Sequence, residues 1–299
     1  MTNIKKFRAA LISTRTAAIP QLQTELLFDV DHCDPLGSPL DEFLGRMSEI
    51  NKLSPHPDKF NVYQGQLLLL GAVAAVESFI RTIFRKIIMI DPESQARVHQ
   101  KDIAYGAALH MSSDLLPEAL LERVSFVGRG AIIDALRDIL GVRGNIPDEL
   151  DQAMQAYMRI CQLRHCAVHR FGKLGAKNAI ALGLEAHKEL IEKPLRFNYA
   201  SLQISVAVAT AMAKVLNNFL FNEILSRVPA ENWTGDYSRD GLIFDRYYNL
   251  FSDRTSYSKT PSPSDLYVQF YSQLADWRIR KNRTPQSFKK SVDAVDEEF

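Results

Sequence analysis

The sequence predicts an all-α protein, and three observations support this fold class. Apolar residues recur at helical spacing over three long segments, residues 62–90, 148–171 and 200–225. Few segments alternate between apolar and polar residues as half-buried strands do. Proline and glycine separate the helical segments from one another. We therefore expect the three long helices to bury their apolar faces against each other in a bundle.

Both ends of the chain differ in composition from this central region. The N-terminal part contains one expected helix before Pro20, a loop with the sequence HCDPLGSP, and a second helix whose first turn carries Asp41 and Glu42. The C-terminal part is rich in aromatic residues and is interrupted by SKTPSPS at residues 258–264. We therefore predict an N-terminal helical extension, a helical core and a partly flexible C-terminal extension, over residues 1–55, 56–226 and 227–299.

Cysteine content and charge limit the classes of protein to consider. The three cysteines, Cys33, Cys161 and Cys166, lack the paired spacing of a disulfide framework, which favours a reducing, cytoplasmic compartment. The N-terminal apolar run is broken by polar residues, which is unlike a signal peptide. A net charge of +1 gives no general attraction to nucleic acid, so any affinity for a polyanion has to come from a local patch.

The longest apolar run is predicted to be a core helix rather than a membrane span. It extends from Leu67 to Ile90 and is long enough to cross a bilayer. However, it contains four charged residues, Glu77, Arg81, Arg85 and Lys86. We therefore expect no association with a membrane.

One short segment carries most of the candidate chemistry. The sequence RHCAVHRFG, residues 164–172, places two histidines and two arginines in the last turns of the second long helix, and Gly172 is the expected end of that helix. From Gln152 to Leu184 the chain contains no acidic residue. A helix end of one charge sign favours binding of an anion such as phosphate. The alternative is a cationic helix end that only offsets the helix dipole.

A metal site is the competing interpretation of the same segment. Cys161, His165 and His169 follow one another every four residues, so they share one helical stripe with spacing that zinc ligands can use. However, a structural zinc site needs a fourth ligand, and the chain has no second cluster of cysteine and histidine. We therefore predict that the protein holds no metal and no cofactor.

The spacing of Arg164 and His169 favours a site shared between two copies of the chain. Residues five positions apart point about 140° apart around a regular helix, so these two side chains do not converge easily on one small group. In a two-fold dimer, the same segment from each copy lines one cleft.

The arrangement of the long helices around this motif resembles the HEPN family, the higher eukaryote and prokaryote nucleotide-binding domains, over roughly residues 56–226. The resemblance implies a metal-independent RNA endonuclease, usually dimeric and frequent among toxins and antiphage defence proteins. Arg164 and His169 match the two invariant positions of the family's motif, and His165 matches the polar position after the arginine. Glu77 resembles an acidic position on the first long helix, where Val73, Ile80 and Phe84 indicate a largely buried stripe. Its role is either to support catalysis or to pair with an arginine of another core helix.

In such an enzyme, a base removes the proton of an RNA 2′-hydroxyl, which attacks the neighbouring phosphorus and expels the 5′-oxygen. His169 is the expected proton acceptor and donor, because imidazole titrates near neutral pH. Arg164 is expected to hold the nonbridging phosphate oxygens, and His165 either orients the phosphate or serves as the second acid or base. The surrounding positive residues are the candidate RNA contacts: Arg159, Arg170, Lys173 and Lys177.

Two other functions remain open from the sequence. The first is a HEPN-like module that dimerises and holds nucleotide or RNA without cleaving it. The second places the activity in the tail, where residues 276–290 combine Trp277 and Phe288 with six basic residues, a composition suited to stacking on bases and contacting phosphates. The expected partners are RNA, a second copy of the chain, and possible antitoxin or defence-system proteins.

Overall fold

The computed structural model describes residue 11, residues 13–14, residues 17–256 and residues 260–283. Over these residues it is helical and contains no strand, which confirms the all-α class. Its α-helices are α1 (Pro39–Lys52), α2 (Val62–Ile90), α3 (Pro92–Val98), α4 (Tyr105–His110), α5 (Leu116–Leu121), α6 (Arg129–Asp138), α7 (Asp148–Arg170), α8 (Ala176–His187), α9 (Tyr199–Leu225), α10 (Tyr237–Phe251) and α11 (Pro263–Arg283). The isolated pairing of Lys173 with Pro194 is the only β-bridge in the described part of the chain.

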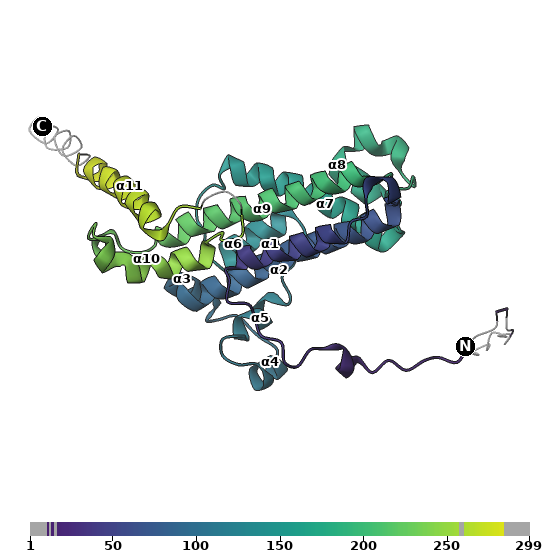
Figure 1. Ribbon diagram of the computed structural model, residues 1–299, viewed down its shortest axis with the longest axis horizontal. Coiled ribbons are helices and arrows are strands. Elements are labelled where there is room, and N and C mark those ends of the chain that lie inside the picture. The colour runs from purple at the N-terminus through teal and green to yellow at the C-terminus, as the bar shows by residue number, and fades with distance from the viewer. Residues whose placement is uncertain (1–10, 12, 15–16, 257–259, 284–299) are drawn as a thin grey trace, which may run out of the picture. The chain divides into compact units, whose positions relative to one another are not determined.

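The three long predicted helices are present as α2, α7 and α9, and each contacts the other two (Figure 1). Asn61 caps the first turn of α2 by accepting a hydrogen bond from the backbone of Gln64 at 2.9 Å. Asn198 caps α9 in the same way. The most deeply buried residues of α2 lie along one continuous face, which packs on α7 and α9. The predicted mutual burial of these three helices is therefore confirmed.

Helices α2 and α9 also have the length and apolar composition of membrane-spanning helices. In this bundle, 56% of the most apolar window of α2 is buried by protein, and 39% of that of α9.

Two compact units make up the chain, residues 1–36 and residues 37–299. In the first unit, the described residues contain one helical turn, η1 (Thr24–Leu27), which buries none of its side chains. Residues 11, 13–14 and 17–20 are not helical, and the rest of the helix predicted before Pro20 lies outside the described residues.

The second predicted N-terminal helix, α1, belongs to the larger unit. Ser38 and Asp41 form a capping box at its start, and the helix packs against α2 and α9. The division at residue 36 therefore differs from the boundary predicted at residue 55, because Leu40, Phe43 and Met47 of α1 contribute to the common core.

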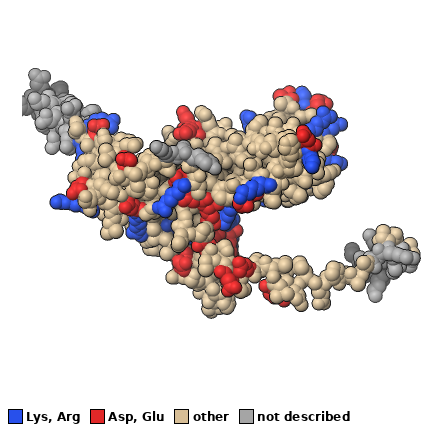
Figure 2. Space-filling model, viewed as in Figure 1, with Lys and Arg blue, Asp and Glu red and all other residues tan. Residues whose placement is uncertain are grey.

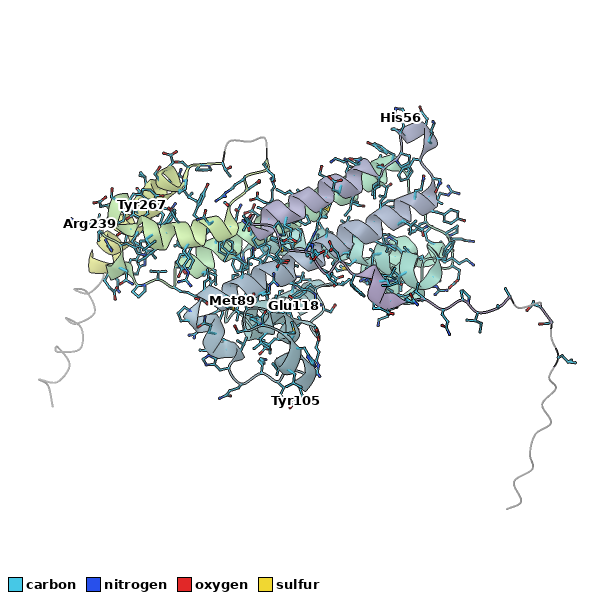
Figure 3. All side chains as sticks on the ribbon, turned by 60° about the horizontal axis from the view of Figure 1, so that its bottom comes forward. His56, Met89, Tyr105, Glu118, Arg239 and Tyr267 are labelled. Carbon is cyan, nitrogen blue, oxygen red and sulfur yellow. The ribbon has the colours of Figure 1, made fainter. Side chains whose placement is uncertain are left out.

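The aromatic residues after residue 226 extend this core. Helix α10 packs on α9, and α11 packs on α10. Trp233, Phe244 and Tyr267 are buried together, and Tyr267 is labelled in Figure 3. The described part of the C-terminal region is therefore folded through its aromatic side chains.

Candidate functional site at the end of helix α7

The geometry of the candidate site depends on how helix α7 ends. Phe171 and Gly172 adopt left-handed backbone conformations, with φ of 50° and 89°, and the Gly172 N–H donates to the Cys166 carbonyl at 3.0 Å. A Cβ atom on Gly172 would lie 2.6 Å from Nε2 of Gln66 on α2. Glycine is therefore required both by the backbone angle and by the approach of α2. The result is a tight turn that holds the last turns of α7 against the start of α2.

The segment after this turn fixes α7 from another side. Residues 173–197 contain the helix α8, followed by the return of the chain to Lys173. Nδ2 of Asn178 on α8 donates to Oε1 of Gln162 on α7 at 2.8 Å. Cys166, Leu174 and Ala179 form a small buried apolar cluster between the two helices. The backbone that carries the motif is thus held by contacts with α2 and with α8.

The two histidines of the motif lie together on the exposed surface of this helix end. The ring centroids of His165 and His169 are 4.4 Å apart, with 52° between the ring planes. Partial desolvation of the otherwise exposed His165 ring lowers its pKa, and the positive charges of His169, Arg164 and Lys177 lower it further. His165 therefore favours the neutral form near pH 7, in which an imidazole accepts a proton.

Arg164 of α7 and Glu77 of α2 both lie near the buried side chains of Cys161 and Tyr157. Both side chains are half-buried. Burial raises the pKa of the Cys161 thiol to about 12, with Glu77 adding to this effect and Arg164 opposing it. Burial also raises the pKa of Tyr157, and the charges of Glu77 and Arg164 act on it in the same opposite directions. The two predicted site residues are therefore close to the same pair of buried groups.

The surroundings of Glu77 fit the predicted stripe only in part. Val73, Ile80 and Phe84 are fully buried, as expected, whereas Glu77 itself is half-buried. Among the described residues, Glu77 has no ion-pair partner within 4.0 Å. Its charge is instead tolerated because the residue is only half-buried.

The four predicted RNA contacts do not form one patch. Arg170 is paired with Glu192, a residue of the segment after α8. Lys177 acts on His165, as described above. Arg159 lies about 120° around α7 from His165 and lines a separate pocket between α7 and α9, together with Arg196. Lys173 is exposed beside Gly172. Figure 2 shows acidic and basic side chains mixed around α8, so the positive segment in the sequence is partly neutralised in space.

The three residues considered as zinc ligands differ in how deeply they are buried. Cys161 is buried in the core, whereas His165 and His169 are exposed. The raised pKa of the Cys161 thiol also disfavours the thiolate that zinc requires. Within the described ranges, no group of three or more histidine, cysteine or acidic residues is arranged to hold a metal ion.

Sequence reasoning missed two features of this region. Tyr157 is fully buried, and its hydroxyl has no hydrogen-bond partner among the described residues. The surface beside the motif also carries four exposed apolar side chains, which we call the apolar end face: Tyr63 and Leu67 of α2, Val168 of α7 and Phe171 of the following turn. The sequence shows that these four residues are apolar. Only the folded structure shows that their side chains remain exposed.

Comparison of the chain with models of known protein families, with curated proteins and with solved structures gives no match. The chemistry of the site therefore has to be argued from its own geometry. An exposed pair of imidazoles can transfer protons, and an adjacent guanidinium can bind an anion.

Proposed function

We propose that the protein is a metal-independent RNA endonuclease of the HEPN type. The observation that carries the proposal is the exposed pair of His165 and His169 at the end of α7, with ring centroids 4.4 Å apart; the charge of Arg164 also acts on His165. Two neighbouring imidazoles supply the two proton transfers that cleavage by a 2′-hydroxyl requires. The guanidinium supplies charge for the phosphate.

The proposed reaction uses the two histidines in turn. One neutral imidazole takes the proton of the 2′-hydroxyl while the bond from O2′ to phosphorus forms. The bond from phosphorus to O5′ breaks, and the other imidazole, in its protonated form, gives a proton to O5′. The lowered pKa of His165 favours the accepting role for this ring, so we assign proton work to both histidines. Arg164 stabilises the negative charge that grows on the nonbridging oxygens.

The proposed enzyme is a homodimer. Helix α7 runs from Asp148 to Arg170 as one helix, so Arg164 and His169 remain about 140° apart within one chain. The apolar end face lies beside them, with exposed fractions of 57% for Tyr63, 67% for Leu67 and 76% for Phe171. Tyr63 and Phe171 also contact each other, with ring centroids 5.4 Å apart. A second copy covering this face brings its own Arg164 and His169 towards those of the first.

The test is RNA cleavage in the presence of EDTA. We expect the unmutated protein to cleave, and His169→Ala to reduce the rate about 10²- to 10⁴-fold through loss of proton transfer. His165→Ala is expected to be similarly severe, and Arg164→Ala is expected also to weaken RNA binding. His110→Ala, which removes another histidine at the end of α4, is the control and should leave the rate unchanged.

Folding of each variant is checked by its helical circular dichroism. His165 and His169 are exposed, so their truncation should cost little stability. Cleavage that persists in His169→Ala, or that EDTA abolishes in the unmutated protein, contradicts the proposal.

A further inference from the structure

The pocket between α7 and α9 that contains Arg159 is lined by no residue of the α7 motif. Its volume is about 480 Å³, within the range of small-molecule sites. The walls are mostly aliphatic, and the apolar lining residues are Ala156, Ile160 and Leu163 of α7, Leu195 and Phe197 of the segment before α9, and Ile204 and Val208 of α9. The polar lining residues are two arginines, Arg159 and Arg196, and two serines, Ser201 and Ser205. The pocket therefore combines an apolar wall with two cations.

The apolar wall is open to solvent along α9. Ile204 is 65% exposed, and Val208, one turn later on the helix, is only half-buried. Over the most apolar window of α9, 39% is buried by protein. Covering these side chains with a hydrocarbon group is favourable, because it removes apolar surface from water. We therefore expect an occupant with an apolar part.

The two serine hydroxyls are already used as donors. Oγ of Ser205 donates to the Ser201 carbonyl at 2.8 Å, and Oγ of Ser201 donates to Oδ1 of Asn198 at 2.9 Å. A hydroxyl has a single proton to donate, so neither serine has a donor left for a ligand. The side-chain donors that remain in the lining are the two guanidinium groups.

Both guanidinium groups are available to an anion. Arg170 of the same helix is paired with Glu192, whereas Arg159 and Arg196 have no acidic partner within 4.0 Å among the residues that the structure describes. The two arginines come from different elements, α7 and the segment before α9, and line the same pocket. Their planar groups match the geometry of a carboxylate or a phosphate.

The backbone that carries Arg196 is fixed on both sides. The N–H of Leu195 donates to the Gly172 carbonyl at 2.9 Å, which ties this segment to the end of α7. On the other side, Oδ1 of Asn198 accepts a hydrogen bond from the Ser201 N–H at 2.8 Å and caps α9. Ser201 lines the pocket, so the positive end of the α9 dipole adds to the attraction for an anion there. Little ordering of the protein is then needed for binding.

We propose that this pocket binds an amphiphilic anion with a single hydrocarbon chain, such as a medium-chain fatty carboxylate. The head group lies between Arg159 and Arg196, and the chain lies along the aliphatic wall formed by Ile160, Ile204 and Val208. A phosphate monoester of the same chain length presents equivalent chemistry to the two guanidinium groups. The proposal does not rest on ribonuclease activity, and it gives Arg159 a role other than the RNA contact predicted from the sequence.

The test is calorimetric titration of the full chain with octanoate, decanoate, decyl phosphate and decanol, each below the concentration at which it forms micelles or separates. We expect one-to-one binding of decanoate, about fifteenfold tighter than octanoate, because two more methylene groups are buried. Decanol, which lacks the charge, should bind at least about tenfold more weakly than decanoate. Binding of either anion supports the proposal, and the tighter one identifies the preferred head group.

Four variants locate the two ends of the ligand. Arg159→Gln and Arg196→Gln should each weaken decanoate binding about tenfold and leave decanol binding unchanged. Ile204→Glu places a negative charge on the apolar wall at an exposed position and should abolish decanoate binding. Ala211→Glu adds the same charge on the same face of α9 two turns later, at an exposed position outside the lining, and should bind normally. Helical circular dichroism checks that each variant folds.

The outcomes separate this pocket from the α7 site. Decanoate binding should be unchanged in His169→Ala, so loss of one activity does not imply loss of the other. Absence of binding by both anions overturns the proposal, as does decanol binding as tightly as decanoate. Binding of many decanoate molecules per chain, or binding that persists in Ile204→Glu, also overturns it, because the ligand then adsorbs elsewhere on the surface.

Discussion

His165 carries the clearest electrostatic signal of the candidate site. Partial desolvation and the charges of His169, Arg164 and Lys177 all favour its neutral form, so its pKa in the folded protein lies below the ordinary value of 6.5. In the unfolded chain these effects are lost. The unfolded state therefore binds more protons than the folded state as the pH falls below about 6.5.

This shift predicts a pH dependence of stability. The free energy of unfolding should fall as the pH falls from about 6.5 towards the lowered pKa of His165, because protonation favours the unfolded chain. His165→Gln should reduce this slope, whereas the control His110→Gln should not. The measurement is urea unfolding of the three proteins at pH values from 7.5 to 5, in steps of about half a pH unit. An equal slope in His165→Gln and the unmutated protein would contradict the assignment.

The charge around this histidine pair was only partly predictable. The sequence correctly identified five positive residues without an intervening acid, and Lys177 does act on His165. However, Glu192 lies 22 positions after Arg170 and pairs with it through the return of the chain after α8. A run of one charge sign in the sequence reports local composition, whereas the field at a site depends on all segments that fold next to it.

The end of α7 is the element on which the site geometry depends. Gly172 combines a φ of 89° with a close approach to Gln66, so the turn couples the motif helix to α2. If this turn changes, both histidines shift relative to α2.

Gly172→Ala should therefore destabilise the protein by about 1–3 kcal/mol, from the left-handed backbone and the displaced Gln66 side chain. RNA cleavage should decrease with it. Gly45→Ala is the matched control, because Gly45 lies inside α1 with helical geometry and nothing within 4 Å of an added Cβ. That variant should gain about 0.5–1 kcal/mol. Urea unfolding measures both, and equal stability of the two variants would show that the turn is not constrained as described.

The elements that were predictable are those with long apolar periodicity. Helices α2, α7 and α9 were predicted with bounds within one residue of the observed ones, because their long apolar periodicity is bounded by polar, proline or glycine residues. Helix α8 was not assigned from the sequence, because its apolar pattern is weak; Gly183 inside it has a φ of 108°. The association of α1 with the core also required the tertiary structure, because its apolar face does not reveal which helices it meets.

At the scale of the whole molecule, the apolar end face is the surface through which we propose that two copies of the chain associate. Leu67 is 67% exposed although it lies on a core helix, and it neighbours Tyr63 on the same face. A single chain gains nothing from exposing this surface, whereas the proposed dimer would bury it beside the histidine pair.

Leu67→Arg should therefore weaken dimerisation about a hundredfold, because burying an unpaired charge costs a few kcal/mol. RNA cleavage should be lost together with the dimer. Leu242→Arg introduces the same charge at a residue of α10 that is 89% exposed, and it should leave both unchanged. Sedimentation equilibrium provides the dissociation constants. A Leu67→Arg protein that remains dimeric would place the interface elsewhere.

The proposed ribonuclease mechanism is tested most directly with a matched pair of RNA oligonucleotides in EDTA. Once the cleavage position is mapped, one oligonucleotide keeps the 2′-hydroxyl there and the other carries 2′-deoxyribose at that single position. We predict that the first is cleaved to a cyclic 2′,3′-phosphate or a 3′-phosphate, and that the second is not cleaved at this position, because the attacking oxygen is absent. Cleavage of the deoxy-substituted strand at the same position, or a 5′-phosphate on the downstream fragment, would contradict proton transfer by His165 and His169 to and from the RNA itself.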